Sequence, residues 1–472
     1  MSAGCQRLAL IFTERANETA LVYGNRSWTY AELLSEGQRR AQHWQAMGVQ
    51  PGARVLLLPA DRSEFLFAIL AGCWGGYELV SVSQKASADE LQYIRNVTQP
   101  HIEWSGDSGE LPTEVAGEPT FYNVQVIFFT SGTTNLPKGV CHKFETLLAN
   151  ADAFNRCTGL GESVRMLHVM PTGYMAGLLN TFLSPIMAGG SVVLGDVFDV
   201  RSALDFWRTA ERGDVNAMWL TPTMVATVTA LCRDDTISDW ARKNLRYVFV
   251  GTAPLHAATR MAFYERLGVD CLESYGMTEC MFVSVNPPTM PNPSHSVGLL
   301  LPGVEAEARG SDGTVLPVGQ EGDLWLRSAY MLDGYLDETS GLPVSAVNMD
   351  GWLDTGDIGR LDVDGRMTIT GRRKDLIIHG GTNVSPKVVE DVLLGFPGVN
   401  DAAVVGAPHP YWGEEVLACV IPETGLGLDS SDLRVHCAAR LNPDAIPGRF
   451  LILEEFPRSS SGKVQKHVLR KM

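Results

Sequence analysis

"FFTSGTTNLPKG", residues 128–139, places two aromatic residues before five consecutive hydroxyl or glycine residues and ends with a proline and a lysine. Small residues let backbone N–H groups approach an anion closely, and the hydroxyls and Lys138 add donors and positive charge. A phosphate group is the expected guest, and a solvated Ser/Thr loop is the alternative. The pattern G-x-x-x-x-G-K-[ST] does not fit, because Gly139 follows the lysine and no Ser/Thr is placed to hold magnesium.

On both sides of this loop the sequence alternates between helix and strand patterns. Residues 28–49 contain a capping box formed by Thr29 and Glu32, one apolar helical face, and Gly48 as a stop signal. The apolar run "ARVLLLPA", residues 53–60, predicts a buried strand, and similar strands are expected at 191–194, 217–220 and 247–250. This alternation predicts an α/β fold with mostly parallel sheets.

The sequence pattern changes near residue 300. Gly- and Asp-rich turns separate short alternating strands in 313–328 and 359–372, which predicts a small β-layer attached to the main body. Beyond Arg372 helices and strands alternate again in a piece of about a hundred residues, large enough for a domain. There Ser385 is the expected N-cap of a helix that has Pro386 at its first position.

The bulk composition excludes several classes of protein. With 472 residues the chain should form two or more domains, and its net charge of −16 disfavours binding to nucleic acid or anionic membranes. The nine cysteines are scattered without a metal-ligand spacing, which favours a reducing, cytoplasmic location. The N-terminus is a poor signal peptide.

Prolines and glycines interrupt the apolar segment 166–195, so we expect a buried turn, helix and strand there and no membrane span.

Six further motifs follow the loop in order: "GTAPL" at 251–255, "ESYGMTE" at 273–279, "WLDTGD" at 352–357, "GRRKD" at 371–375, "GGTNVSP" at 380–386 and "PRSSSGK" at 457–463. Together with "FTSGTTNLPKG" they resemble the adenylate-forming superfamily, which contains acyl- and aryl-CoA synthetases, adenylation domains of peptide synthetases and beetle luciferases. The resemblance covers essentially the whole chain. It implies an α/β N-terminal adenylation core, residues 1–373, and a mobile α+β C-terminal lid, residues 374–472.

The resemblance also implies roles for individual residues. In isolation several of these motifs have simpler interpretations, such as a tight Gly-x-x-Pro turn at 251–254, a helix N-terminal acid at Glu279, or an aspartate in a glycine turn at Asp357. The implied roles are phosphate binding by Thr130, Ser131, Gly132, Thr133, Thr134, Lys138 and Thr278; contact with adenine by Gly251, Thr252, Ala253, Pro254, Tyr275 and Gly276; ribose binding by Asp357 and Arg372; Mg²⁺ binding by Glu279; catalysis by Lys463, Thr278 and Glu279; a hinge at Lys374; and a thiol channel at Gly380 and Gly381.

The implied reaction has two steps. A carboxylate attacks the α-phosphate of MgATP to give an acyl-adenylate and pyrophosphate, with Lys463 neutralising charge, and the lid then rotates about Lys374 to admit a thiol, most simply coenzyme A. The expected acid pocket is apolar with a few hydroxyls, which favours a neutral, moderately apolar acid. It combines Tyr174, Met175, Ala176, Trp219, Thr221, Phe249, Val250, Ser274, Met281 and Phe282. Tyr174 stands where amino-acid activators carry an aspartate, and nearby His168 is interpreted as a satisfied core residue.

Two alternatives remain open. The adenylate could pass its acyl group to a carrier-protein pantetheine or to an amine, which would make the protein an amide ligase. The chain could also be a non-catalytic nucleotide or acyl binder, although Lys463, Glu279 and Thr278 are all present and favour an enzyme.

Overall fold

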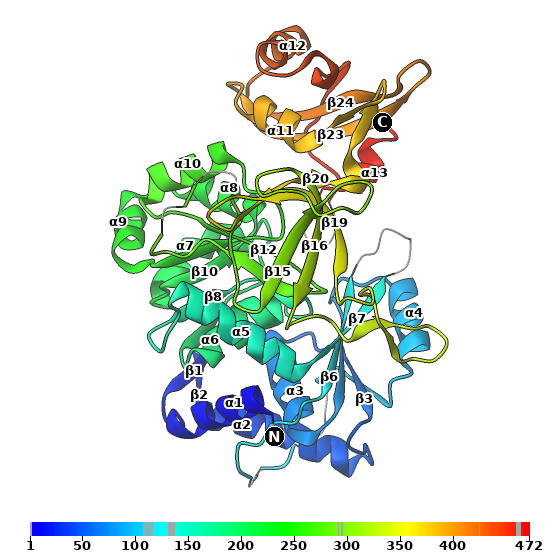
Figure 1. Cartoon of the computed structure of the whole chain (residues 1–472). Coiled ribbons are helices and arrows are strands. Elements are labelled where there is room, and N and C mark those ends of the chain that lie inside the picture. The colour runs from blue at the N-terminus through cyan, green and yellow to red at the C-terminus, as the bar shows by residue number, and fades with distance from the viewer. Residues whose placement is uncertain are drawn as a thin grey trace.

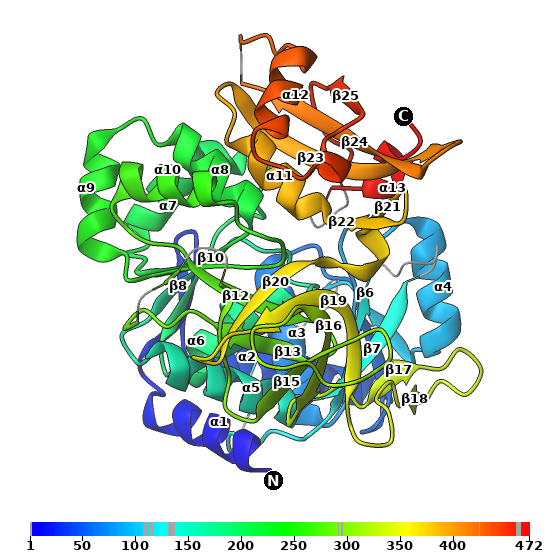
Figure 2. The same ribbon diagram turned by 45° about the horizontal axis from the view of Figure 1, so that its top comes forward.

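The computed structural model describes residues 2–106, 111–113, 115, 117–130, 137–290, 292–293, 296–423, 425–458 and 464–472. In these residues a large body of two sheets and their covering helices carries a smaller C-terminal part on one side (Figures 1 and 2). No helix in the described ranges has the length and apolar character needed to cross a bilayer. The expected turn, helix and strand between residues 166 and 195 are present and buried.

The largest sheet contains 13 strands. Its order is β15 (Val304–Arg309), β16 (Gly322–Ser328), β19 (Leu353–Leu361), β20 (Arg366–Arg372), β14 (Gly298–Leu300), β13 (Met281–Val285), β12 (Leu272–Met277), β11 (Tyr247–Val250), β10 (Ala217–Leu220), β8 (Arg165–His168), β9 (Ser191–Leu194), β1 (Thr19–Tyr23) and β2 (Arg26–Thr29). In this sheet β1, β9, β8, β10, β11 and β12 pair in parallel. From β12 through β13, β14, β20 and β19 to β16 and β15 the pairing is antiparallel. The predicted β-layer therefore exists, and its strands continue the parallel sheet through β12 and β13.

A second sheet has seven strands. Its order is β18 (Pro343–Val344), β17 (Gly334–Leu336), β7 (Lys138–Lys143), β6 (Gln125–Thr130), β4 (Glu78–Ser81), β3 (Arg54–Leu57) and β5 (Ile102–Trp104). The helices of the main body are α1 (Ala3–Glu14), α2 (Tyr30–Ala46), α3 (Arg62–Gly75), α4 (Ala88–Thr98), α5 (Phe144–Thr158), the π-helix η1 (Ala176–Leu183), α6 (Ser184–Met187), α7 (Ser202–Arg212), α8 (Pro222–Leu231), α9 (Asp235–Asn244) and α10 (Ala257–Leu267).

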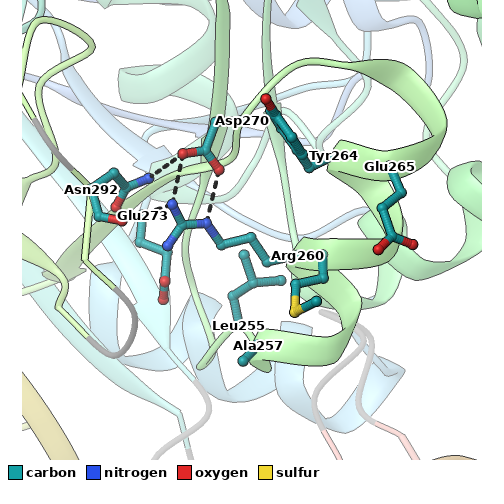
Figure 3. A pocket seen from close by; sticks show the side chains of 9 residues that line it. Leu255, Ala257, Arg260, Tyr264, Glu265, Asp270, Glu273 and Asn292 are labelled. Carbon is teal, nitrogen blue, oxygen red and sulfur yellow. Dashed lines mark hydrogen bonds and ion pairs between the residues drawn. The ribbon is translucent and has the colours of Figure 1, made fainter.

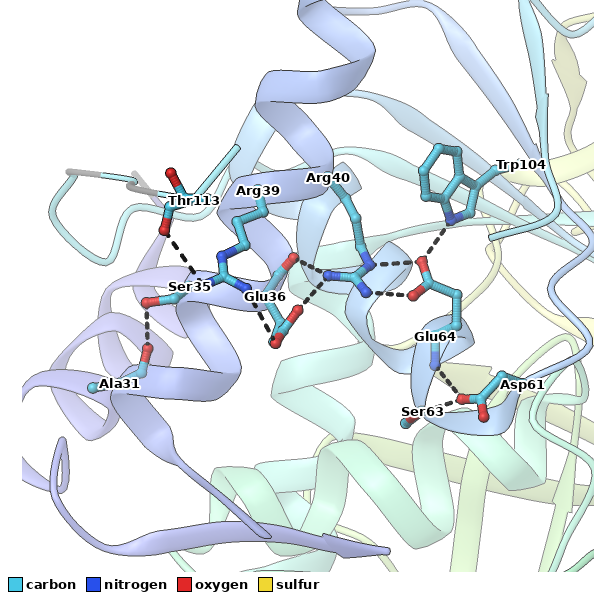
Figure 4. A network of polar contacts seen from close by, with 10 residues as sticks. All are labelled: Ala31, Ser35, Glu36, Arg39, Arg40, Asp61, Ser63, Glu64, Trp104 and Thr113. Carbon is cyan, nitrogen blue, oxygen red and sulfur yellow. Dashed lines mark hydrogen bonds and ion pairs between the residues drawn. The ribbon is translucent and has the colours of Figure 1, made fainter. Parts of the chain in front are cut away.

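A buried ion-pair network fixes α2 against α3 (Figure 4). The Arg40 guanidinium, 5% exposed, donates to Glu64 at 2.6 Å and to Glu36 at 2.6 Å. Trp104 Nε1–H in β5 donates to the same Glu64 carboxylate at 2.8 Å. A buried guanidinium needs such partners, because an uncompensated charge in the interior is strongly destabilising. The network thus sets the position of the seven-stranded sheet relative to its helices.

The C-terminal part has its own sheet and its own apolar clusters, whose described members all lie between residues 377 and 469. The 3₁₀ helix η2 (Arg373–Asp375) connects it to β20. Its elements are β21 (Ile377–His379), β22 (Thr382–Val384), α11 (Pro386–Leu394), β23 (Val399–His409), β24 (Gly413–Pro422), α12 (Ser430–Ala438), the 3₁₀ helix η3 (Pro443–Ala445), β25 (Arg449–Ile452) and α13 (Lys466–Leu469). The expected N-terminal end of α11, with Ser385 and Pro386, is confirmed.

Candidate active site

The candidate site lies where β10, β11 and β12 end at their carboxyl termini, the edge at which parallel sheets bind ligands. The chain leaves β11 at Gly251, which is buried, while the three following residues are exposed. Thr252 has φ +71°, a left-handed conformation that is costly for a β-branched residue. A Cβ atom at Gly251 would lie 3.0 Å from the Ser274 carbonyl oxygen, a tight contact that would force the two strands to shift apart, so glycine favours this close approach.

Tyr275, Asp357 and Arg372 meet at one point although they come from different parts of the sequence. The Tyr275 hydroxyl donates to Asp357 Oδ2 at 2.5 Å, and Arg372 Nε lies 2.8 Å from Asp357 Oδ1. Asp357 is 2% exposed. Burial and the Asp357 charge raise the pKa of Tyr275, so the hydroxyl stays protonated and donates. The two predicted ribose ligands are therefore adjacent, and Tyr275 shares their carboxylate.

The turn between β12 and β13 carries Thr278 and Glu279, both partly exposed. Tyr335 in β17 donates its hydroxyl to Glu279 Oε1 at 2.9 Å, and Lys138 Nζ lies 5.1 Å from the centre of the Tyr335 ring. Lys138 thereby approaches the turn from the end of the 128–139 loop. Tyr335 occupies only one of the two Glu279 carboxylate oxygens, and among the described residues no hydrogen bond is made to the other, Oε2, which suits a metal ligand.

His142 in β7 makes a hydrogen bond to the same turn. Burial lowers the pKa of His142 to about 4, so the ring is neutral and its Nε2–H donates to the Thr278 carbonyl oxygen at 2.7 Å. The sequence motifs did not identify His142 or Tyr335 as site residues. Both lie on strands of the other sheet, and a single sequence contains no signal that places those strands beside β12.

A cavity of about 440 Å³ opens on the α10 side of the 251–255 loop (Figure 3). Glu273 lines it and is 7% exposed. Burial raises the pKa of Glu273 to about 7, against the opposing effect of Arg260 and Lys387. Arg260 is held by two contacts of 2.8 and 2.6 Å to Asp270. No predicted catalytic residue lines this cavity, which adjoins the loop without forming the expected acid pocket.

Aromatic rings fill the position of the expected acid pocket. Trp219 stacks on Phe249 with 5.4 Å between ring centres, and Phe154 stacks on Phe282 at 4.1 Å. Phe154 also contacts Trp219 at 5.6 Å and Phe249 at 5.0 Å. All four side chains are at most 3% exposed. Met281 belongs to the same apolar cluster, and Met175 packs against it.

Val250 differs from the other predicted pocket residues. It belongs to the apolar cluster under α8 and α10, whereas its neighbour Phe249 joins the cluster that contains Trp219. Successive side chains of a strand point to opposite faces, so the two residues cannot line one wall. The same applies to Ala176, which packs against the cluster of Val250. Ser274 faces the hairpin and donates to the Ser284 carbonyl oxygen at 2.7 Å, and Tyr174 is partly exposed at the start of the π-helical segment.

His168 is a core residue, as expected, but only one of its two ring nitrogens has a hydrogen-bond partner among the described residues. His168 is fully buried, and the buried Arg62 guanidinium donates to its Nδ1 at 3.1 Å and to its carbonyl oxygen at 3.2 Å. The remaining ring nitrogen, Nε2, has no hydrogen-bond partner among the described residues, and neither has Trp219 Nε1. His168 and Trp219 stand on the paired strands β8 and β10.

Several predicted residues lie outside the described ranges, namely Ser131, Gly132, Thr133, Thr134 and Lys463. The ends of the phosphate loop are described: Thr130 in β6 pairs with Lys138 in β7, which closes the loop at its base. On the lid, Arg458 donates to Thr223 Oγ1 at the start of α8 at 3.3 Å. Arg458, the last described residue before Lys463, therefore contacts the main body.

Lys374 lies between residues anchored to different parts of the molecule. Its neighbour Arg373 lies 2.6 Å from Asp354 and 3.1 Å from Asp323 in the main body, whereas Asp375 faces Arg470 of the lid at 3.7 Å. Gly380 and Gly381 form the turn between β21 and β22 with φ values of +58° and +90°, as two-residue hairpin turns require. The backbone conformation of this turn therefore explains why both residues are glycine. The hinge role of Lys374 and the channel role of the two glycines remain predictions.

The residues present fit a nucleotide and a divalent cation. Asp357 and Arg372 offer an acceptor and a donor fork of the kind that ribose hydroxyls use, and Glu279 offers a carboxylate beside Lys138. Within the described ranges no group of three or more His, Cys, Asp or Glu side chains could hold a metal by itself. A cation at Glu279 would therefore share its coordination with phosphate oxygens, as Mg²⁺ commonly does.

Comparisons with known proteins agree with this geometry. Residues 11–104 and 103–336 match the AMP-binding enzyme family, and residues 388–463 match the AMP-binding enzyme C-terminal domain. The chain is 35% identical to a sulfoacetate–CoA ligase of Cupriavidus necator over 72% of its length, a match that spans 65% of that relative. It is 28% identical to a 2-succinylbenzoate–CoA ligase of Bacillus subtilis over 96% of this chain and 94% of that protein.

Solved structures of similar overall shape cover nearly the whole chain. ATP-bound MatB from Rhodopseudomonas palustris superposes with a TM-score of 0.86 at 26% identity, covering 98% of each chain, while apo MatB gives 0.77 with the same identity and coverage. The amide bond synthetase McbA from Marinactinospora thermotolerans gives 0.86 at 26% identity, covering 98% of this chain and 99% of that chain. The chain belongs to the AMP-binding enzyme family and is an AMP-forming ligase of the acid–thiol type.

Proposed function

We propose that this protein uses MgATP to activate a short carboxylic acid as its acyl-adenylate and then transfers the acyl group to a thiol, most simply that of coenzyme A. The observation that carries the proposal is the junction of Tyr275, Asp357 and Arg372 beside the exposed 251–255 loop and the Glu279 turn. These groups would bind the ribose, the adenine and the phosphates of ATP at one edge of the sheet.

In the first step a carboxylate oxygen of the acid forms a bond to the α-phosphorus, and the bond to the bridging oxygen of pyrophosphate breaks. Lys138 and Thr278 bind phosphate oxygens, and Lys463 neutralises the carboxylate as it attacks. A cation held by Glu279 would withdraw charge from the phosphates. His142 keeps the turn that carries Thr278 and Glu279 in place.

In the second step the thiolate sulfur bonds to the acyl carbon, and the phosphate oxygen of AMP leaves. The lid residues Gly380 and Gly381 would then face the acyl group after rotation about Lys374. An acceptor on a carrier protein, or an amine, uses the same adenylate. The likeness to an amide bond synthetase supports keeping the amine acceptor as a second candidate.

The aromatic cluster supports a short acid. Four rings in mutual contact, Phe154, Trp219, Phe249 and Phe282, occupy the volume that a long or bulky acyl tail would need. Side chains this well packed resist displacement, since interiors have the density of organic crystals. The pocket therefore favours acids with few carbon atoms and an apolar tail.

One observation favours a second substrate class, a short acid with a distal anionic group. The Arg62 guanidinium is 4% exposed, and within the described residues its hydrogen bonds go to His168 and to the Met170 carbonyl oxygen, with no carboxylate in ion-pair range. His168 Nε2 and Trp219 Nε1 lack partners in the same part of the described chain. The carboxylates of Asp196 and Asp61 act on Arg62 without forming an ion pair with it. A sulfonate or second carboxylate of the substrate would satisfy the His168 and Trp219 donors and add a negative charge near Arg62.

Acid-dependent pyrophosphate release tests the function. The panel should contain pairs with the same number of carbon atoms, such as butyrate with succinate, together with a long acid and an aryl acid. Each acid is tested with and without coenzyme A, and with an amine acceptor. We expect release with short acids and consumption of the coenzyme A thiol. Preference for the anionic member of each pair would select the second class. No pyrophosphate release with any acid would contradict an enzymatic function. The buried free cysteines agree with action in a reducing compartment, which we propose to be the cytoplasm.

A further inference from the structure

One hydrogen bond ties the lid directly to the segment that follows the 251–255 loop. His256 Nδ1–H donates to Asp391 Oδ1 at 2.6 Å, across 135 residues of sequence. His256 is the N-cap residue of α10, and Asp391 lies in α11 of the lid. Their side chains are 20% and 27% exposed, so the contact lies within the interface between the two parts.

The Asp391 carboxylate is held as an anion at this interface. Its second oxygen lies 3.0 Å from Lys387 Nζ, one turn earlier in α11. Burial by itself would raise the pKa of Asp391, but the hydrogen bond from His256 and the charge of Lys387 together hold that pKa below its usual value. Charge-assisted hydrogen bonds of this kind are stronger than neutral ones.

His256 is also directly connected to the loop that the resemblance assigns to adenine. It directly follows Leu255, whose backbone N–H bonds to the Glu273 carboxylate at the base of β12. The 251–255 loop is therefore fixed at its end by β12 on one side and by the lid on the other. A second lid contact, from Arg458 to Thr223, lies at the start of α8, and Arg458 also pairs with Asp401 at 2.6 Å.

We propose that His256 and Asp391 form a positioning pair that holds the lid on the loop during adenylate formation and separates before acyl transfer. This inference rests on the proposed function. The lid position in this structure brings His256 and Asp391 into contact, and we assign this position to adenylate formation. Neither residue contacts a reacting group in the proposal; each acts through the position of the lid.

The test measures the two half-reactions separately in the full-length protein. Acid-dependent exchange of pyrophosphate into ATP reports the first, and thioester formation from supplied acyl-adenylate and coenzyme A reports the second. His256→Ala and Asp391→Asn should each slow the exchange about tenfold, the effect of losing one charge-assisted hydrogen bond. Thioester formation from the supplied adenylate should stay unchanged or become faster, because the lid is released.

Two controls separate positioning from folding. His256→Gln retains an N–H donor and should restore most of the exchange rate. Arg449→Gln removes an ion pair with Glu415 that lies wholly within the lid, and should leave both half-reactions unchanged. If His256→Ala fails to fold, Asp391→Asn tests the same contact from the lid side.

Equal losses in both half-reactions, or no loss in either, would overturn the inference. So would the same loss from His256→Gln as from His256→Ala. If the unmodified protein exchanges no pyrophosphate with any acid, the proposed function fails. If it does exchange and the variants behave like it, only the positioning role fails.

Discussion

Phe249 and Val250 are neighbours in β11, yet Phe249 packs among Trp219 and Phe154 on one face of the sheet and Val250 packs under α8 and α10 on the other. The acid pocket can therefore be altered on one face while the other serves as a reference. This separation makes the pocket assignment testable with two substitutions of core residues.

Trp219→Leu should widen the range of acids. The substitution removes the ring that stacks on Phe249 and leaves a shorter apolar side chain, so longer acids should gain at least about tenfold in kcat/KM relative to short ones. Pyrophosphate release across a series of straight-chain acids measures the change. Val250→Ala is the matched control, because it should lower the melting temperature without changing the preferred length. An unchanged length preference in Trp219→Leu would remove Trp219 from the pocket.

Asp357→Asn should weaken ATP binding. The substitution removes the negative charge that Tyr275 and Arg372 share, and the loss of charge-assisted bonds to ribose should raise KM for ATP about 10- to 100-fold. Exchange rates at a series of ATP concentrations measure this. Asp364→Asn, in the exposed turn after β19, is the control and should have no effect. A normal KM in Asp357→Asn would show that ribose binds elsewhere.

Glu279→Gln should raise the Mg²⁺ concentration needed for half-maximal exchange. An amide oxygen still accepts the Tyr335 hydrogen bond, but it binds a hard cation less well than a carboxylate. We expect a loss of about 100-fold at limiting Mg²⁺ that high Mg²⁺ partly restores. Tyr335→Phe, which retains the carboxylate, should have a smaller effect. A Mg²⁺ requirement equal to that of the unmodified protein would argue against metal binding at Glu279.

Lys463→Ala should slow adenylate formation and spare acyl transfer. A substitution that blocks the thiol channel should have the opposite effect on the two half-reactions. If this lysine neutralises the attacking carboxylate, its loss should slow adenylate formation about 100-fold or more while acyl transfer from supplied adenylate continues. Lys471→Ala, an exposed lysine near the same terminus, serves as the control. Adenylate formation that stays nearly intact would exclude the catalytic role.

Glu273 should make stability depend on pH. Its pKa is raised by burial from about 4.5 to about 7, so the folded protein binds this proton more tightly than the unfolded chain does. The resulting stabilisation is fully present below pH 4.5 and is lost as the pH rises to 7. Relative to the unmodified protein, Glu273→Gln should gain stability over this window, by at most about 3 kcal/mol. Urea unfolding of both proteins at pH 5 and pH 8 measures the gain, and an equal difference at both pH values would contradict it.

The linear motifs predicted the α/β fold, because hydrophobic periodicity depends on local chemistry, and the residue roles that they imply remain predictions. The strands at 191–194, 217–220 and 247–250 have the bounds that the apolar runs predicted. Asp357 and Arg372 come together as the motif resemblance implied, whereas Tyr275, which the resemblance assigned to adenine, donates to Asp357. The thirteen-stranded continuity of the first sheet was not predicted, because it depends on the antiparallel pairing of β12 with β13.

The sequence alone determined the alternation of helices and strands, the loop chemistry and the order of the motifs, since hydrophobic periodicity and small or charged residues act over a few positions. Only the tertiary structure decided that Val250 and Phe249 pack on opposite faces and that four aromatic rings fill the position of the expected pocket. It also decided that His142 and Tyr335 contact the Glu279 turn and that His256 meets Asp391. Those relationships depend on contacts between strands and helices far apart in the chain, and such contacts are set by the packing of whole sheets.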